Sequence, residues 1–490
     1  MSPLSTEVEE GLLRLQRMDV RLVDGLFEHP GVVHRTDEHR LRYALALACL
    51  DRFQPGAARW GRRTLKPEVH VRSPRLGRWR KRVLEGLETP LLLEDSRERV
   101  EAALATLEPW LPQLEQTRDE VIEKYADEFS PRELDQELGI KRLVSVAGGG
   151  GGAGYVYLGA WEVLHNAGLI PSLVVGSSMG ALLGLFRALR RKADFDEYLA
   201  LAKGIRAEEV FRYVSLRRRY GLPGIVRLFL HEAIGAALSE GGTELRISDL
   251  EIPYEAVVAG VRRGALGETP EQYAHEHHLH EDERPSPLQL RAQVATQLVR
   301  LIGLMNPRMV QEIAIGGDEL TRDLNAIDAA GFSSAIPGVL HYDVTRDDSR
   351  SHEILTQVME REDVVALVDG GAVNNVPART AWRQVQDGRI GTRNAYVLAF
   401  DCFHPQWSLK HVWLRPVTRV ISLQVALNER FAHRRVEFQP TLSPINLLPT
   451  AEYLDEAVTW GREQMSAELP RLQKFFERVR WVPPEEEESS

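Results

Sequence analysis

Residues 176–180, Gly-Ser-Ser-Met-Gly, form a G-x-S-x-G pattern between two apolar stretches. The preceding segment, PSLVVG, predicts a strand, and the following segment, MGALLGLFRALRRK, predicts a helix. In a nucleophile elbow, Gly176 and Gly180 let the chain turn sharply, so that the Ser178 side chain projects from a sheet edge at a helix N-terminus. The alternative interpretation is a tight turn in which the serine only caps the helix.

A run of glycines interrupted by Ala153, Gly148–Gly154, follows the predicted strand KRLVSVA. A phosphate-binding P-loop requires a Gly-Lys-Ser/Thr ending, which this run lacks. A dinucleotide fingerprint is matched by Gly149, Gly151 and Gly154, but the acid expected about 20 residues later is missing. The remaining interpretation is an oxyanion hole that serves Ser178, because the carboxyl ends of parallel strands meet at one sheet edge.

The third motif, Asp369-Gly370-Gly371, comes directly after VVALV, which predicts a buried strand at 364–368. A carboxylate at a strand end, followed by two glycines that allow close approach, suits a general base. The same three residues also suit an ordinary turn. Taken alone, this motif leaves both interpretations open.

The elements around these motifs predict a helical region followed by an α/β region. The chain of 490 residues is 43% apolar and 27% charged, as in soluble globular proteins of several domains. Residues 1–140 show apolar spacing typical of helices and predict an N-terminal domain or cap. Residues 141–465 alternate strands and helices and predict a mostly parallel central sheet, with helical insertions at about 185–250 and 265–330. Residues 466–490 predict a helix end and an acidic tail.

Composition also bears on the compartment and on partners. Cys49 and Cys402 are the only cysteines, and the N-terminus lacks a signal-like pattern, which together favour the cytoplasm. The net charge of −10 argues against a nucleic-acid partner. Segment 59–82 is the exception, since it carries ten Lys or Arg against one acid, interleaved with Trp60 and Trp79. It predicts peripheral contact with an anionic membrane surface, a nucleic-acid patch, or a solvated loop that pairs with acids elsewhere.

Taken in order, the three motifs resemble the patatin-like phospholipase family. The pattern of that family is a glycine-rich oxyanion loop, a G-x-S-x-G nucleophile and an Asp-Gly-Gly base motif. The resemblance extends to AGYVYLGAWEVLHNAGL, IPYEAVVAGVRRG, AAGFSSAIPGVL at 329–340, and LVDGGAVNNVPA around the base. It covers residues 140–465 and implies a three-layer α/β/α core.

The resemblance implies a lipid acyl hydrolase in which Ser178 is the nucleophile and Asp369 is its base, without a metal or a cofactor. Its substrate would be a phospholipid, a lysophospholipid or another acyl lipid. Ala153 stands where the family usually has Arg or Lys, which removes a cation but keeps the backbone donors. The glycines implied to supply oxyanion N–H groups are Gly149, Gly150 and Gly151. The glycines that complete the three motifs are Gly154, Gly176, Gly180, Gly370 and Gly371.

Two other functions remain open at this point. A Ser-Asp-His triad esterase would use Ser178 and Asp369 with one of the histidines His404, His411 and His433. A non-catalytic or conditionally active lipid- or protein-binding member of the same fold would keep the elbow without turnover. The histidines within 275–280 lie in a polar stretch without the spacing of a defined metal site and predict a solvated loop.

Overall fold

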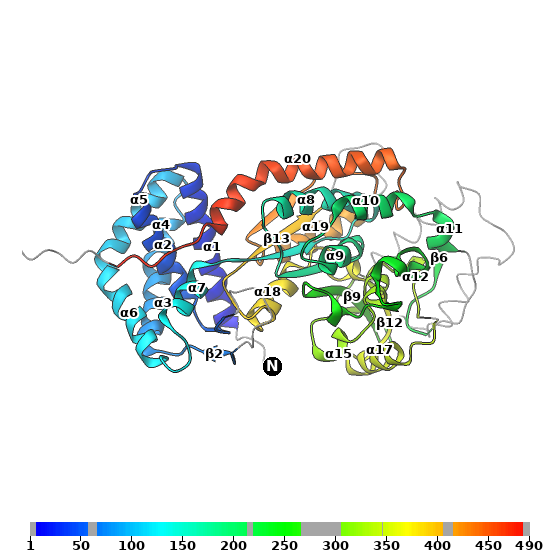
Figure 1. Cartoon of the computed structure of the whole chain (residues 1–490), viewed down its shortest axis with the longest axis horizontal. Coiled ribbons are helices and arrows are strands. Elements are labelled where there is room, and N and C mark those ends of the chain that lie inside the picture. Colours follow the sequence, from blue (N-terminus) through cyan, green and yellow to red (C-terminus); the bar gives the residue numbers. More distant parts are fainter. Residues whose placement is uncertain are drawn as a thin grey trace, which may run out of the picture. The chain divides into compact units, whose positions relative to one another are not determined.

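The computed structural model describes residues 6–56, 66–212, 219–265, 305–344, 346–404 and 415–483. The chain divides into two compact units, and both are drawn in Figure 1. Unit 1 comprises Met1–Leu143, Arg383–Tyr396 and Glu468–Ser490, and unit 2 comprises Val144–Trp382 and Val397–Ala467. Unit 1 therefore gathers three separate stretches of the chain.

Unit 1 is built mainly from helices (Figure 1, blue to cyan). A short strand pair joins β1 (Arg52–Phe53) to β2 (Val69–His70). Several of these helices begin at a residue whose side chain accepts backbone N–H groups of the first turn. At the start of α7, Ser130 and Glu133 form a reciprocal capping box. The helices are α1 (Thr6–Glu28), α2 (Arg35–Cys49), α3 (Pro74–Gly86), α4 (Glu88–Leu91), α5 (Ser96–Leu107), α6 (Leu111–Lys124) and α7 (Pro131–Gly139).

Trp79 belongs to α3, within the basic segment 59–82. Its side chain is 0% exposed, and its indole N–H donates to the carbonyl of Ala44 at 3.1 Å. A tryptophan packed in this way cannot enter a membrane interface without opening the core of unit 1. The expectation that Trp79 contributes to membrane contact is therefore wrong, whereas Trp60 lies outside the described residues.

Unit 2 is organised around a mostly parallel sheet of seven strands, in the order β10-β9-β4-β3-β13-β14 with β12 also pairing β9. The pairs β3–β4, β4–β9 and β13–β14 are parallel, whereas β10 and β12 run antiparallel to β9. This arrangement confirms the predicted α/β fold class. The strands are β3 (Arg142–Ala147), β4 (Leu173–Ser177), β9 (Tyr254–Arg262), β10 (Val310–Ile315), β12 (Val364–Asp369), β13 (Ala395–Asp401) and β14 (Arg434–Glu437).

Strand β10 pairs along one edge of β9. Two strands share the other edge of β9, and each of them pairs with one half of its length. Its first half pairs in parallel with β4, and its second half pairs antiparallel with β12. The two strands therefore run toward each other. Their last residues, Ser177 and Asp369, lie opposite the consecutive residues Val257 and Val258 of β9.

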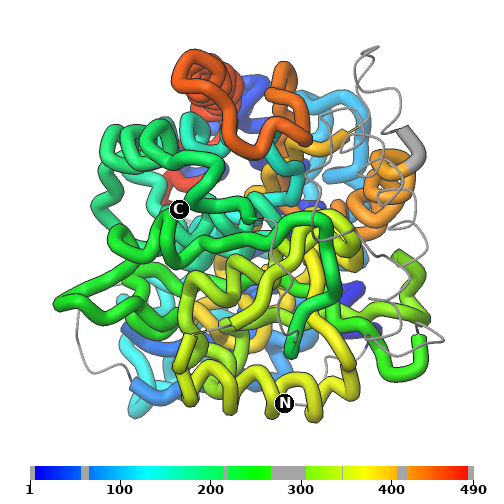
Figure 2. The backbone as a smooth tube through the Cα atoms, turned by 90° about the vertical axis from the view of Figure 1, so that its right-hand side faces the viewer, coloured from blue at the N-terminus to red at the C-terminus, as the bar shows by residue number. Residues whose placement is uncertain are grey.

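The helices of unit 2 pack closely enough to require glycine at one crossing. A Cβ on Gly159 of α8 would meet the backbone of Val458, and one on Gly461 of α20 would meet the backbone of Val156. Figure 2 shows the green and yellow segments of this unit in front. The helices that lie or begin in unit 2 are α8 (Val156–Asn166), α9 (Met179–Leu189), α10 (Phe195–Gly204), α11 (Ala207–Val210), α12 (Leu230–Ile234), α15 (Glu319–Arg322), α16 (Ala326–Ser333), α17 (Ser349–Arg361), α18 (Ala378–Gln386), α19 (Arg415–Glu429) and α20 (Ala451–Phe476).

The region 185–250 was expected to be a helical insertion, but it also contains strands. The strands β5 (Phe211–Arg212) and β6 (Gly224–Leu228) form a small sheet with β11 (Gly338–His341), in which β6 and β11 are parallel. A two-residue hairpin joins β7 (Ser239–Glu240) to β8 (Thr243–Glu244). These strands are short and β6 pairs with a segment more than 100 residues away, so local periodicity does not reveal them.

The described part of region 265–330 differs from expectation in the same way, because it supplies β10 of the central sheet.

Within the described ranges, none of the helices combines the length and the apolar character that crossing a bilayer demands.

Candidate active site

Ser178 occupies the turn between β4 and α9. Its φ of +53° lies in a region that residues other than glycine rarely adopt. Strain of this kind costs about 1–3 kcal/mol and persists only where the surrounding structure enforces it. A Cβ on Gly176 would meet the backbone of Ala181, and one on Gly180 would meet the carbonyl of Ala147. Both glycines are therefore needed for the sharp strand-to-helix turn.

The Ser178 hydroxyl donates a hydrogen bond to Oδ2 of Asp369 at 2.6 Å. The two side chains come together because β4 and β12 meet end to end on β9. Both are nearly buried, with Ser178 8% and Asp369 5% exposed. The other carboxylate oxygen of Asp369 accepts the N–H of Gly371 at 2.7 Å, and a Cβ on Gly370 would meet the carbonyl of Val257.

The environment of Asp369 suits a group that must gain and lose a proton near neutral pH. Burial raises the pKa of the Asp369 carboxyl to about 6, although the hydrogen bonds from Ser178 and from the Gly371 amide lower it. A carboxylate with a raised pKa accepts a proton more readily than an exposed one. The pair can therefore act as a hydroxyl and its proton acceptor without a third residue between them.

The glycine loop lies beside this pair, but its amides are not equivalent. The N–H of Gly149 donates to the carbonyl of Asn375 at 3.0 Å, and the Asn375 side chain donates back to the Gly149 carbonyl at 3.3 Å. Within the described ranges, the N–H groups of Gly150 and Gly151 have no acceptor. The Gly149 amide is thus bonded within the protein, whereas the amides of Gly150 and Gly151 are not.

The other loop residues support the elbow by close packing. A Cβ on Gly154 would meet the side chain of Met179, the first residue of α9. A Cβ on Gly149 would meet the Cβ of Ser178 at 2.9 Å, so the loop backbone passes directly beside the elbow. Ala153 is fully buried in the 3₁₀ turn Gly151–Tyr155, and its methyl group faces the protein interior.

Sequence reasoning missed Ser333, at the end of α16. Its hydroxyl accepts the backbone N–H of Ser178 at 2.9 Å and donates to the carbonyl of Val257 at 2.6 Å. Two residues later, the carbonyl of Ala335 accepts the N–H of Asp369 at 2.9 Å. One short segment thus holds the backbone of both residues of the pair. Its sequence signal was the stretch AAGFSSAIPGVL, which does not reveal which serine faces the elbow.

Asn375, six residues after Asp369, was missed as well. The segment VNNVPA contains two adjacent asparagines, and only the structure separates their roles. Asn375 bonds the glycine loop, whereas the Asn374 amide donates to Glu312 at 3.1 Å. The only sequence signal for Asn375 was the likeness of LVDGGAVNNVPA to the base segment of the family.

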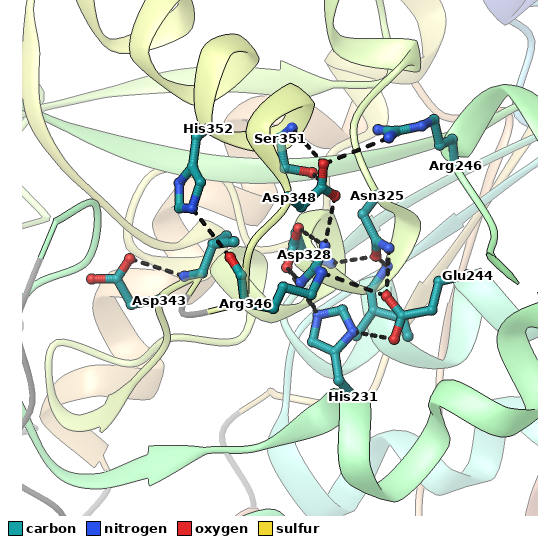
Figure 3. Close-up of polar contacts among 12 residues, drawn as sticks. His231, Glu244, Arg246, Asn325, Asp328, Asp343, Arg346, Asp348, Ser351 and His352 are labelled. Carbon is teal, nitrogen blue, oxygen red and sulfur yellow. Dashed lines mark hydrogen bonds and ion pairs between the residues drawn. The ribbon is translucent and has the colours of Figure 1, made fainter.

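A polar network anchors the other end of α16, and Figure 3 draws it. Asp328 is 0% exposed and accepts hydrogen bonds from Arg346 at 2.8 and 2.6 Å and from Tyr342 at 2.6 Å. The ring of His231 lies between Asp328 and Glu244, at 3.0 and 2.7 Å. Burial alone would raise the pKa of Asp328, but hydrogen bonds from His231 and Arg346 lower it to about 2. Because these bonds fix α16, they also help to fix Ser333.

The described histidines proposed for a triad have other partners. His404 contacts the carbonyl of Phe438 at 3.1 Å, and His433 accepts the N–H of Val397 at 3.0 Å. Within the described part of the chain, Asp369 is bonded by Ser178 and by Gly371 rather than by a histidine. His411 and the histidines within 275–280 lie outside the described residues.

Comparison with known proteins agrees with the predicted resemblance. Residues 145–382 match a family model described as "Patatin-like phospholipase". The triacylglycerol lipase ptl3 of Schizosaccharomyces pombe is 32% identical over 84 residues, which is 17% of this chain and 17% of that protein. The chain thus spans under a fifth of the length of this curated relative. Residues 145–382, which carry the elbow, the glycine loop and Asp369, therefore form a domain of the patatin-like phospholipase family.

Proposed function

We propose that this chain hydrolyses fatty acyl ester bonds of lipids, with Ser178 as the nucleophile and Asp369 as its general base. The observation that carries the proposal is the 2.6 Å hydrogen bond from the Ser178 hydroxyl to Asp369 at a strained strand-to-helix turn. The family match and the lipase relative support a lipid ester as the substrate.

In the proposed mechanism, Asp369 accepts the Ser178 proton while Oγ forms a bond to the ester carbonyl carbon. The tetrahedral intermediate collapses as the C–O bond to the leaving group breaks, and Asp369 returns the proton to the departing alcohol. Water then attacks the acyl-enzyme, Asp369 takes one of its protons, and that proton restores the Ser178 hydroxyl as the fatty acid leaves.

The amides of Gly150 and Gly151 are the proposed oxyanion donors, because their N–H groups are free within the described ranges. One such donor contributes about 2.7–4 kcal/mol to stabilising the transition state. The proposal assigns Gly149 and Asn375 the task of holding the loop in place. The missing cation at Ala153 does not affect these backbone donors.

The proposal is tested by incubating the purified chain with vesicles of phosphatidylcholine, with lysophosphatidylcholine and with emulsified triacylglycerol. Release of free fatty acid from at least one of them, with labelling of Ser178 by a fluorophosphonate, is expected. Variants His404→Ala and His433→Ala should keep their activity if the base acts without a histidine. Absence of both labelling and product from well-folded protein would support a binding role instead.

The pH dependence of kcat/KM should report the ionisation of Asp369. Because its pKa is raised to about 6, the carboxyl is protonated and unable to act as a base below that pH. Activity is therefore expected to rise with pH through about 6 and then to level off. The measurement uses a soluble short-chain ester between pH 4 and 9, with folding monitored by circular dichroism. A profile that is flat down to pH 4 would exclude Asp369 as the base.

Ser333→Ala is expected to lower kcat about tenfold or more with little change in KM, since it removes the acceptor of the buried Ser178 N–H, and an unpaired buried N–H costs about 1–3 kcal/mol. Ser334→Ala is the matched control, because the Ser334 hydroxyl has no hydrogen-bond partner in the described structure. Ser333→Thr restores a hydroxyl and should recover most of the activity. Equal losses in the two alanine variants would contradict a positioning role for Ser333.

A further inference from the structure

Helix α19 of unit 2 (Figure 1, orange) exposes two leucines, Leu423 and Leu427. Leu423 is 63% and Leu427 is 75% exposed, which makes them the two most exposed large apolar side chains of the described residues. They are four residues apart and therefore lie one above the other on one face of the helix. The opposite face is buried and carries Val417, Ile421 and Val425. The helix thus has one apolar face in the core and a second apolar stripe in contact with solvent.

Arginines flank this exposed stripe at both ends. Arg419 lies one turn before the first leucine, and Arg430 follows the last helical residue, three positions after the second leucine. Both arginines are exposed. The nearby acid Glu429 accepts a hydrogen bond from Arg435 at 3.1 Å, so its charge is paired. Four side chains together form what we call the α19 face: Arg419, Leu423, Leu427 and Arg430.

The polar edge of the same helix holds the segment that follows the proposed base, Asp369. The Gln424 side chain donates to the carbonyl of Ala372 at 3.2 Å, and the Asn428 side chain donates to Oδ1 of Asn374 at 3.1 Å. Each of these two amides directly follows one of the exposed leucines in the chain. The α19 face therefore belongs to a helix that is bonded to the segment carrying the candidate site.

We propose that the α19 face docks the chain on the surface of a lipid bilayer that contains anionic head groups. The leucines enter the boundary between head groups and acyl chains, and the arginines interact with the phosphates and carboxylates at that boundary. This inference rests on the proposed function, because a lipid ester in a bilayer or an emulsion is reached only at its surface.

The small size of the stripe favours a lipid surface over a second copy of this chain. A stable interface between two proteins buries about 800 Å² per partner, far more than two leucine side chains can cover. A bilayer needs no matching shape, so a few apolar side chains with flanking positive charge are sufficient for reversible binding.

The test is co-sedimentation of the full chain with vesicles of phosphatidylcholine and phosphatidylserine in equal amounts. The chain carries Ser178→Ala, so that the vesicles stay intact whatever its activity. Combining Leu423→Gln with Leu427→Gln should weaken vesicle binding about tenfold or more, because glutamine does not enter the acyl boundary. Arg419→Gln should weaken it about fivefold on these vesicles and have little effect on pure phosphatidylcholine.

The matched control combines Leu92→Gln with Leu93→Gln. These leucines belong to unit 1, are 40% and 38% exposed and lie outside the α19 face. The control should change vesicle binding less than about twofold, as expected for a surface substitution away from the docking face. Circular dichroism checks the folding of each variant. If the double α19 variant does not fold, Leu427→Gln alone carries the test, since Leu427 is the more exposed leucine.

Activity measurements in the chain that retains Ser178 separate docking from catalysis. The double α19 variant should lose about ten times more activity on the vesicles than on a soluble short-chain ester. Equal losses on the two substrates, or vesicle binding that is unchanged by the leucine substitutions, would overturn the proposal. A wild-type dimer that these substitutions dissociate in analytical ultracentrifugation would also overturn it and assign the α19 face to a second copy.

Failure of the proposed hydrolysis gives a different result. A wild-type chain that binds vesicles through the α19 face but releases no fatty acid would support docking and reject the hydrolysis. A chain that hydrolyses the soluble ester but binds vesicles equally well with and without the leucines would reject docking and support the hydrolysis.

Discussion

Ser178→Ala is expected to lower kcat for lipid ester hydrolysis by about 10⁵-fold or more, the scale of losses seen when a serine nucleophile is removed. Alanine has no oxygen with which to form the acyl-enzyme, and Asp369 is left without a proton to accept. The measurement is release of fatty acid from the best lipid substrate at saturating concentration, together with loss of fluorophosphonate labelling.

A second substitution separates this loss from misfolding. Alanine retains the strain of serine at φ +53°, whereas glycine adopts this conformation freely. Ser178→Gly should therefore be as inactive as Ser178→Ala, but its unfolding free energy should be about 1 kcal/mol higher. Retention of more than a tenth of the wild-type activity in both variants would show that Ser178 is not the nucleophile.

Asp369→Asn is expected to lower kcat about 10³-fold or more without destabilising the protein, because asparagine cannot accept the Ser178 proton. The raised pKa determines the effect on stability. When the pKa of an acid is higher in the folded than in the unfolded state, the folded state binds the proton of that acid more tightly. Its ionisation therefore reduces stability as pH rises from about 4 through 6. At pH 7 this amounts to about 3 kcal/mol for a rise of two pKa units, and asparagine removes the cost.

Chemical unfolding of wild type and Asp369→Asn at pH 7 and pH 4 measures this difference. The variant should be as stable as wild type or more stable at pH 7, and the gain should shrink at pH 4. Asp363→Asn is the matched control, because Asp363 is an exposed carboxylate paired with Arg263 at the surface and should affect neither activity nor stability strongly. A variant that keeps full activity would contradict a role for Asp369 as the base.

The local features of the candidate site could be predicted from the sequence. The strand before Ser178 and the helix after it follow from β-branched and helical apolar patterns over five to eleven residues. The strand that ends at Asp369 follows in the same way. Such patterns depend on neighbours along the chain, so the three motifs and the α/β class were accessible without a structure.

Other expectations failed because they depended on distant contacts. Trp79 belonged to a basic segment and suggested a membrane surface, but the helices of unit 1 bury it completely. The strands β6 and β10 were expected to be helical or polar segments, since each is short and gains its partner from elsewhere in the chain. Burial and strand pairing are properties of the assembled core rather than of a sequence window.

The amino-acid sequence by itself determined the residues that could react and the turns that carry them. Tertiary structure alone decided that β4 and β12 meet end to end on β9, which brings Ser178 to Asp369, 191 positions later. It also decided that Ser333 holds the elbow and that the Asn375 carbonyl accepts the Gly149 N–H, across 155 and 226 positions. These contacts follow from strand register and helix packing, which no local pattern encodes, because each hydrogen bond needs two segments placed by the whole core.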